Sequence, residues 1–142
     1  AIRAETTSSS ASMVAAIPSV RAAILNWQRE FARDAARDSG GAVLHGRDIG
    51  TVVCPDADAK LFITASVQAR AERRVKELQA RGETAIYARV LQDMQERDAR
   101  DQGRSISPTR PATDALIIDT SDLTADQVFE RALAFIASKM KA

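Results

Sequence analysis

Apolar residues recur every three or four positions in three stretches of the chain, the spacing that places them on one face of a helix. The first helix is expected to begin at Pro18, which suits a first helical position, and to run to about Arg37. Glycine in the sequence Ser39-Gly40-Gly41 then supplies a left-handed exit. The residues expected on the buried face of this helix are Val20, Ile24, Trp27 and Phe31.

Three more helices are expected in the second half of the chain. Ser66 is a good N-cap for a helix over 67–80, and Gly82 closes that helix. A helix over about 84–100 follows, and Thr124 caps the last helix. The inward-facing residues are Ile86, Val90, Leu91 and Met94 in the former and Val128, Ala132, Phe135 and Ile136 in the latter.

Short apolar runs between these helices predict strands. The run 60–65 is apolar on both faces, as buried strands of parallel sheets are, and 115–119 is a second strand. The shorter runs 42–44 and 51–53 are also expected to be core strands. The order of strands and helices predicts an α/β fold with a parallel sheet covered by helices. With no internal repeat and no low-complexity linker, we expect a single domain over 1–142.

Composition narrows the function classes. Twenty Lys and Arg against nineteen Asp and Glu give a net charge of +1, without the basic excess typical of nucleic-acid binding. One cysteine and one histidine cannot form an intramolecular disulfide or a His-rich metal site. We expect a cytoplasmic monomer with no signal peptide, no membrane segment and no nucleic-acid partner. Sixteen of the twenty cations are arginines, which bind phosphates through two parallel hydrogen bonds, although codon bias and surface ion pairs also produce arginine.

Polar clusters carry the candidate chemistry at 12–21, 45–51 and 97–104. In the second cluster, Arg47 and Asp48 stand between two glycines at the carboxyl end of the strand expected at 42–44. Open α/β sheets bind their ligands at that edge, and the glycines let the backbone approach a ligand. An ion pair that braces a tight turn explains the same residues equally well.

In the third cluster, Arg97, Asp101 and Arg104 are spaced i, i+4, i+7 and share one face of a continuing helix. Two arginines beside one carboxylate can hold a phosphate and a ribose hydroxyl. A solvated helix face with ion pairs is the ordinary alternative, and it also applies to the basic patch of Arg70, Arg73 and Arg74.

Taken together and in this order, the motifs resemble those of bacterial cytidylate kinases. The matching stretches are I-R…A-S-x-V-A-A-I-P-S-V-R (2–21), G-R-D-I-G-T-V-V-C-P (46–55), R-A-E-R-R (70–74) and R-D-A-R-D-Q-G-R (97–104). The resemblance implies a partial P-loop NTPase-like, three-layer domain. It also implies transfer of the γ-phosphoryl group of ATP to CMP or dCMP, with Mg²⁺, giving CDP or dCDP and ADP.

The resemblance also implies a division of the chain into segments, and it implies a further segment that typical family members have. It implies a CMP-side segment and helix (1–40), core strands (41–65), lid and helices (66–110) and the last strand and helix (111–142). A typical family member begins with a P-loop, but neither G-x-x-x-x-G-K-[ST] nor G-x-G-x-x-G occurs here. We therefore expect the C-terminal two thirds of such an enzyme, without metal ligands of its own and inactive alone.

Matching positions imply the site residues. Ser12, Arg21 and Asp48 would contact cytosine, Arg47 and Arg104 the CMP phosphate, and Arg97 with Asp101 the sugar. The expected catalytic residues are Arg47, Arg97 and Arg104, and the expected ATP-binding lid residues are Arg73 and Arg74. His45 stands where the family tends to have Asp, and Cys54 is expected to be a small packed residue.

This set also suits the chemistry of cytosine. The N4 amino group of cytosine donates a hydrogen bond to a carboxylate, whereas uracil presents an acceptor there and would leave Asp48 unpaired, at a cost of about 2 to 5 kcal/mol. The alternatives are a catalytically silent nucleotide- or RNA-binding module and another nucleoside monophosphate kinase. Near-zero net charge and few aromatic residues disfavour the former, and the set of Ser12, Arg21 and Asp48 disfavours the latter.

Overall fold

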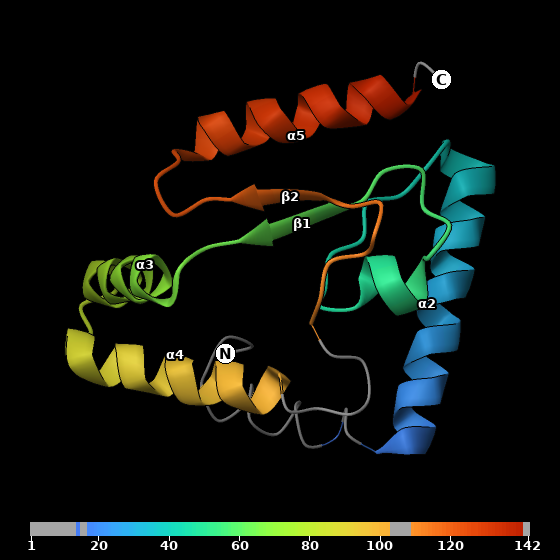
Figure 1. Ribbon diagram of the computed structural model, residues 1–142. Helices are drawn as coiled ribbons and strands as arrows, with labels where there is room; N and C mark the ends of the chain where they lie inside the picture. Colours follow the sequence, from blue (N-terminus) through green and yellow to red (C-terminus); the bar gives the residue numbers. More distant parts are fainter. Residues whose placement is uncertain (1–13, 15–16, 103–108, 141–142) are drawn as a thin grey trace. The chain divides into compact units, whose positions relative to one another are not determined.

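A computed structural model describes residues 14, 17–102 and 109–140, with the side chains of 100–102 left out (Figure 1). The contacts within the chain divide it into two compact units, Ala1–Gly46 and Arg47–Ala142. Each unit is described by itself below.

The described part of the first unit is dominated by one long helix, α2 (Pro18–Ser39). Pro18 occupies its first turn, as predicted. The helix ends at Gly40, whose φ of 75° is left-handed, and the Gly41 N–H donates to the Ala35 carbonyl at 3.1 Å. Both ends of the helix therefore follow the local signals of the sequence.

The prediction of a buried apolar face on α2 is wrong. Ile24, Trp27 and Phe31 are all exposed, Trp27 to 66%. The rings of Trp27 and Phe31 stack on each other with centroids 6.2 Å apart. The described part of this unit contains no second element against which the stripe could pack, and an apolar face is buried only when such an element exists.

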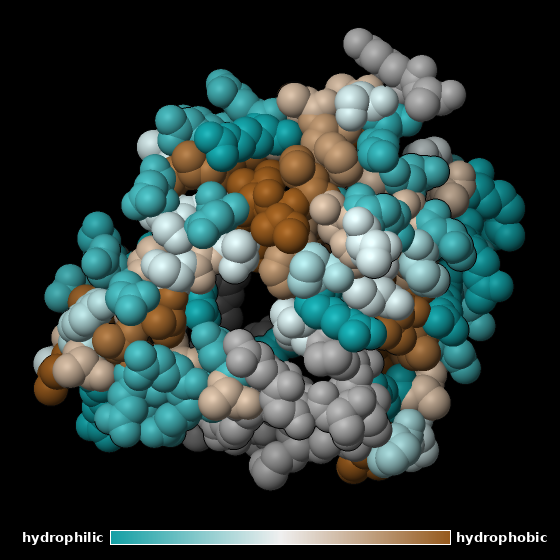
Figure 2. Space-filling model, viewed as in Figure 1, coloured by the Kyte–Doolittle hydropathy of each residue, from teal (hydrophilic) through white to brown (hydrophobic). Residues whose placement is uncertain are grey.

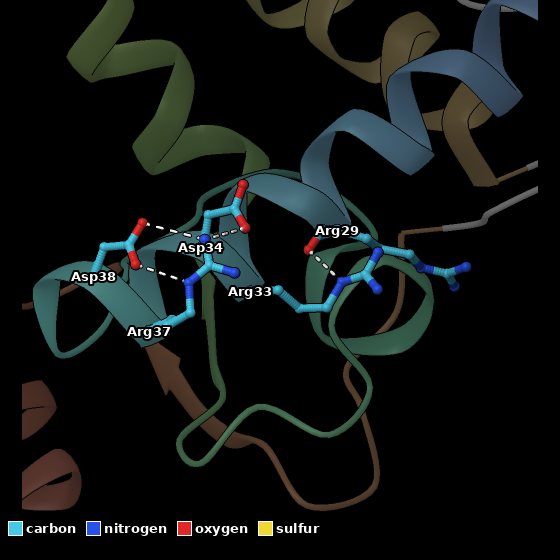
Figure 3. Close-up of polar contacts among 5 residues, drawn as sticks. All are labelled: Arg29, Arg33, Asp34, Arg37 and Asp38. Carbon is cyan, nitrogen blue, oxygen red and sulfur yellow. Dashed lines mark hydrogen bonds and ion pairs between the residues drawn. The ribbon is translucent and has the colours of Figure 1, made fainter.

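Charged side chains of α2 pair with one another at its surface (Figure 3). Arg37 Nε donates to Asp38 Oδ1 at 2.8 Å, and Arg37 Nη2 donates to Asp34 Oδ1 at 3.2 Å. Arg33 Nε donates to the Arg29 carbonyl at 3.3 Å. These groups are solvent-exposed, so water and salt screen them and they add little to stability. For these arginines the surface ion-pair explanation holds.

The second unit contains a two-stranded parallel sheet, β1 (Leu61–Thr64) and β2 (Leu116–Asp119). The register pairs Leu61 with Leu116 and Thr64 with Asp119, so both strands end at the same edge. Helices flank the sheet, which confirms the α/β class: α5 runs alongside the strands, and α3 and α4 pack on each other beyond the strands' carboxyl ends (Figure 1). Apolar surface gathers beside α5 (Figure 2).

The helices of this unit begin and end close to their predicted bounds. They are α3 (Val67–Ala80), α4 (Tyr87–Gln102) and α5 (Ala125–Met140). Ser66 caps α3 by accepting from the Ala69 N–H at 3.2 Å. Thr124 and Gln127 form a reciprocal cap on α5, each accepting from the other's backbone N–H. The least exposed positions of α5 are those predicted to face inward: Val128, Ala132, Phe135 and Ile136.

Two predicted core strands are absent from the described residues of 41–65. Residues 42–44 form no strand, and Val43 is 98% exposed. Residues Ile49–Val53 form a π-helical turn, in which the Val52 and Val53 N–H groups donate to the Asp48 carbonyl. A strand persists only where a neighbouring strand takes its backbone hydrogen bonds, and β1 and β2 take each other's. The turn satisfies its bonds locally instead.

A buried lysine ties the loop before β1 to the start of β2. The side chain of Lys60 is only 8% exposed, and its Nζ donates to both carboxylate oxygens of Asp114, at 2.9 and 2.7 Å, and to the Pro55 carbonyl. This ion pair lowers the pKa of Asp114. A Cβ added at Gly50 would lie 3.4 Å from Lys60 Cδ, so the turn approaches the lysine stem closely.

The reciprocal cap on α5 predicts a measurable loss of stability. Thr124→Ala should lower the free energy of unfolding by about 1 kcal/mol, because the Gln127 N–H loses its acceptor. Thr124→Ser keeps the hydroxyl and is the matched control. Urea unfolding followed by circular dichroism measures both, and equal stability of Ala and Ser variants would show that the cap contributes nothing.

Candidate functional site

The predicted site residues are spread over both units. Arg21 lies on α2 in the first unit, whereas Arg47, Asp48 and Arg97 belong to the second. Ser12 and Arg104 lie outside the described residues, and the Asp101 side chain is not described although its backbone belongs to α4. The geometry of the site is therefore built from the second unit.

Asp48 organises the turn that follows the Gly-Arg-Asp sequence. Its carbonyl accepts from the Val52 N–H at 2.8 Å, the Val53 N–H at 3.2 Å and the Thr51 hydroxyl at 3.4 Å. The backbone of Asp48 thus braces the turn, so its carboxylate is not required for these bonds. Asp48 itself is half-buried. The π-helical turn Ile49–Val53 takes the place of the strand that the sequence predicted over 51–53.

A two-pronged ion pair joins α3 to α4. Arg70 Nη1 donates to Asp98 Oδ1 at 3.0 Å, and Arg70 Nη2 pairs with Asp98 Oδ2. Arg70 Nε donates to the Ala65 carbonyl at 3.2 Å, just after β1 ends. Each side chain of the pair is about a third exposed. Three elements, β1, α3 and α4, therefore meet at one guanidinium.

The charges of two predicted site arginines also influence the pKa of Asp98. The hydrogen bonds from Arg70 lower the pKa of Asp98 most, and the charges of Arg97 and Arg47 lower it further. In return Asp98 raises the pKa of Arg70. The charges of one residue from the cluster at 45–51 and one from the cluster at 97–104 therefore influence the same carboxylate. Guanidinium groups suit an anion such as a phosphate, to which they can donate two parallel hydrogen bonds.

The two predicted lid arginines lie on α3 and make different contacts. Arg73 Nη1 donates to Thr120 Oγ1 at 3.0 Å, and Arg73 Nη2 donates to the Thr120 carbonyl. Thr120 is 6% exposed, and its backbone N–H and hydroxyl both donate to the Thr64 carbonyl. Arg74 pairs with Glu77 along its own helix at 2.9 Å. Arg73 is thus attached to the carboxyl edge of the sheet, and Arg74 is not.

Sequence reasoning noted two residues of this site without giving them a role. Arg70 belongs to a basic patch and to the 70–74 motif, and Asp98 belongs to the 97–104 motif, but neither is assigned a role from the sequence. They are 28 positions apart, and nothing in the local sequence indicates their pairing. Thr120 was overlooked, although its position directly after a predicted strand in a parallel sheet was a usable signal.

The described residues contain neither a metal-binding cluster nor a membrane-spanning helix. They contain no group of three or more His, Cys, Asp or Glu side chains that could hold a metal ion. Among them no helix is both long enough and apolar enough to cross a membrane. The chemical resources of the described site are therefore guanidinium groups, carboxylates and hydroxyls.

The Arg70–Asp98 pair predicts a pH-dependent stability. Because the folded-state pKa of Asp98 lies below its ordinary 3.8, the pair stabilises the fold above that value and the stabilisation is lost as the pH falls through the lowered pKa. Asp98→Asn should therefore lose less stability than the wild type between pH 6 and pH 3. Asp93→Asn, on the exposed side of α4, is the control, and urea unfolding at both pH values is the measurement. Identical losses in the wild type and Asp98→Asn would contradict the prediction.

Comparison with known proteins agrees with this arrangement of motifs. The sequence model of the family described as cytidylate kinase matches residues 1–138. The cytidylate kinase of Paramagnetospirillum magneticum is 59% identical over 139 residues, covering 97% of this chain and 65% of that protein. Those of Rhodospirillum rubrum and Vibrio cholerae are 52% and 49% identical, over 63% and 60% of their lengths. The chain spans less than two thirds of these relatives, and it belongs to the cytidylate kinase family.

Proposed function

We propose that this chain forms most of the CMP site and the lid of a kinase that transfers the γ-phosphoryl group of ATP to CMP or dCMP. The observation that carries the proposal is the match of the cytidylate kinase family model to residues 1–138, a range that contains both the Gly-Arg-Asp motif at 46–55 and the motif at 97–104. The charges of Arg47 from the former motif and Arg97 from the latter both lower the pKa of Asp98. Relatives that share this sequence over nearly its whole length are cytidylate kinases.

Cytosine recognition is assigned to Ser12, Arg21 and Asp48. A carboxylate and a hydroxyl accept hydrogen bonds from the N4 amino group, and an arginine donates to O2 or N3. The position of Asp48 supports its part in this set, because it directly precedes the turn Ile49–Val53, and its backbone carbonyl accepts hydrogen bonds from that turn.

The phosphate and sugar of CMP are assigned to the remaining motif residues. Arg47 and Arg104 bind the phosphate, and Arg97 with Asp101 binds the sugar hydroxyls. Phosphoryl transfer needs the two phosphates held in line and their growing charge neutralised, and arginine forks do both. None of these residues has to act as a general base.

ATP is assigned to the lid, with Arg73 and Arg74 near its phosphates. The contact between Arg73 and Thr120 supports a position for this arginine at the carboxyl edge of the sheet, where α/β proteins bind nucleotides. Mg²⁺ is part of the family's chemistry, but the described residues offer no cluster of ligands for it. We assign to this chain the binding and orientation of the two nucleotides.

The first test is turnover. The chain extended at its N-terminus with the corresponding segment of the P. magneticum enzyme should release ADP in a coupled assay with CMP and dCMP, and far more slowly with UMP. The 142-residue chain alone should show little or no turnover, because its sequence contains no P-loop motif. Robust turnover by the 142-residue chain would contradict the second expectation, and preference for UMP would contradict cytosine recognition.

The second test replaces Asp48, the carboxylate that is proposed to recognise the cytosine base. In the extended protein, Asp48→Ala should raise KM for CMP by roughly 10- to 100-fold and leave KM for ATP nearly unchanged, because the N4 group loses its acceptor in a desolvated pocket. Asp58→Ala, in the exposed loop that follows, is the control. Thermal unfolding of each variant checks the fold. If Asp48→Ala unfolds the protein, the side chain of Asp48 is needed for the fold, and it does not read the base.

A further inference from the structure

Lys60, the last residue before β1, joins the sheet to the turn that follows Asp48. Its backbone carbonyl accepts from the Leu116 N–H at 2.9 Å, so the residue is fixed to the start of β2. Its side chain is only 8% exposed, and its ammonium group pairs with Asp114 and donates to the Pro55 carbonyl. One residue therefore binds both to the sheet and to the loop that leads out of the turn.

The hydrocarbon stem of this lysine lies against the turn itself. A Cβ added at Gly50 would be 3.4 Å from Lys60 Cδ and 3.6 Å from Lys60 Cγ. Gly50 does not have a positive φ, so the lysine stem, and not the backbone, limits the size of a side chain at this position. Gly50 is two positions from Asp48, whose carbonyl accepts the hydrogen bonds of the turn. The lysine stem therefore supports the turn close to Asp48.

The ammonium group fixes the stem in this place. Burial of an ammonium costs free energy that its partners have to offset, and apolar residues of similar size often stabilise a fold as well or better. What the charge adds is a defined position. Lys60 Nζ donates to both carboxylate oxygens of Asp114, at 2.9 and 2.7 Å, and to the Pro55 carbonyl, so three acceptors hold the end of the side chain.

We propose that Lys60 is a positioning residue for cytosine recognition: its fixed side chain holds the turn at Gly50 and Pro55 and thereby determines where Asp48 lies. The proposal rests on the function proposed above, in which Asp48 recognises the N4 amino group of cytosine. A binding group has to be held within about 0.5 Å of its productive position, so a turn that shifts weakens the binding of CMP and its distinction from UMP.

The alternative is that Lys60 and Asp114 only tie the loop before β1 to the start of β2. Two variants separate these possibilities. Asp114→Asn and Lys60→Ala both break the ion pair, but only Lys60→Ala also removes the stem from Gly50 and the hydrogen bond to Pro55. A mere tie predicts the same effect on kinetics in both variants, whereas a positioning role predicts a change in cytosine recognition in Lys60→Ala alone.

The experiment uses the extended protein and steady-state kinetics with CMP, UMP and ATP. Lys60→Ala should raise KM for CMP by roughly 3- to 30-fold and reduce the preference for CMP over UMP, because a small displacement of a binding group has effects of this order. KM for ATP should change little. Asp114→Asn is the matched control, and it should keep KM for CMP and the preference near the wild-type values. Thermal unfolding measures the stability that each variant loses.

A second pair of variants tests the contact at Gly50. With Lys60 in place, Gly50→Val should raise KM for CMP, because its side chain needs the space that the lysine stem occupies. In Lys60→Ala that space is empty, so the addition of Gly50→Val should do little further harm. Such non-additivity is expected of residues that are in contact.

Every other outcome has a defined meaning. The proposal is wrong if Asp114→Asn raises KM for CMP as much as Lys60→Ala does, if Lys60→Ala keeps the wild-type KM and preference, or if the effects of Gly50→Val and Lys60→Ala simply add. If Lys60→Ala fails to fold, Gly50→Val and Asp114→Asn decide, and an unchanged KM for CMP in Gly50→Val overturns the proposal. Absence of CMP phosphorylation by the extended protein without substitutions overturns the proposed function, and this proposal with it.

Discussion

Parallel pairing of β1 with β2 is the constraint on which the described site depends. Because parallel strands end at one edge, Thr64 and Thr120 become neighbours, and the Thr120 N–H donates to the Thr64 carbonyl at 2.8 Å. That edge receives the first turns of α3: Arg70 bonds the Ala65 carbonyl, and Arg73 bonds Thr120. Arg70 also pairs with Asp98 of α4. Shifting this register would displace the groups that Arg70 and Arg73 bond at the ends of the strands.

Arginine side chains contribute differently to the structure depending on where they lie. Arg37 on α2 pairs with two carboxylates in full contact with water, where screening and side-chain entropy leave little net gain. Arg70 and Arg73 are fixed by backbone carbonyls as well as by side chains, so their geometry is set before any ligand arrives. The arginines therefore divide into those that pair at the surface of α2 and those, such as Arg70 and Arg73, that are anchored at the carboxyl edge of the sheet.

Features that depend on neighbouring residues could be predicted from sequence, and features that depend on distant partners could not. Proline at the start of α2, Gly40 at its end, and the caps at Ser66 and Thr124 act within one helical turn, so the helix bounds were predicted closely. The Trp27 stripe and the Val43 run were misread because burial and strand pairing require a second element in space. The motifs located Arg47 and Arg97 in advance. The pairing of Arg70 with Asp98 depends on how α3 folds back against α4, which the local pattern does not encode.

A site made of several arginines has to meet two opposing requirements. Gathered guanidinium groups repel each other, so a carboxylate among them lowers the cost of bringing them together. The same carboxylate is chemically similar to the phosphate that the site is to bind, and it is always present at high effective concentration. An arginine that is oriented by the backbone can occupy the hydrogen-bonding face of such a carboxylate and leave its charge in place. Arg70 has this geometry, because its Nε donates to the Ala65 carbonyl and its two Nη groups pair with both oxygens of Asp98.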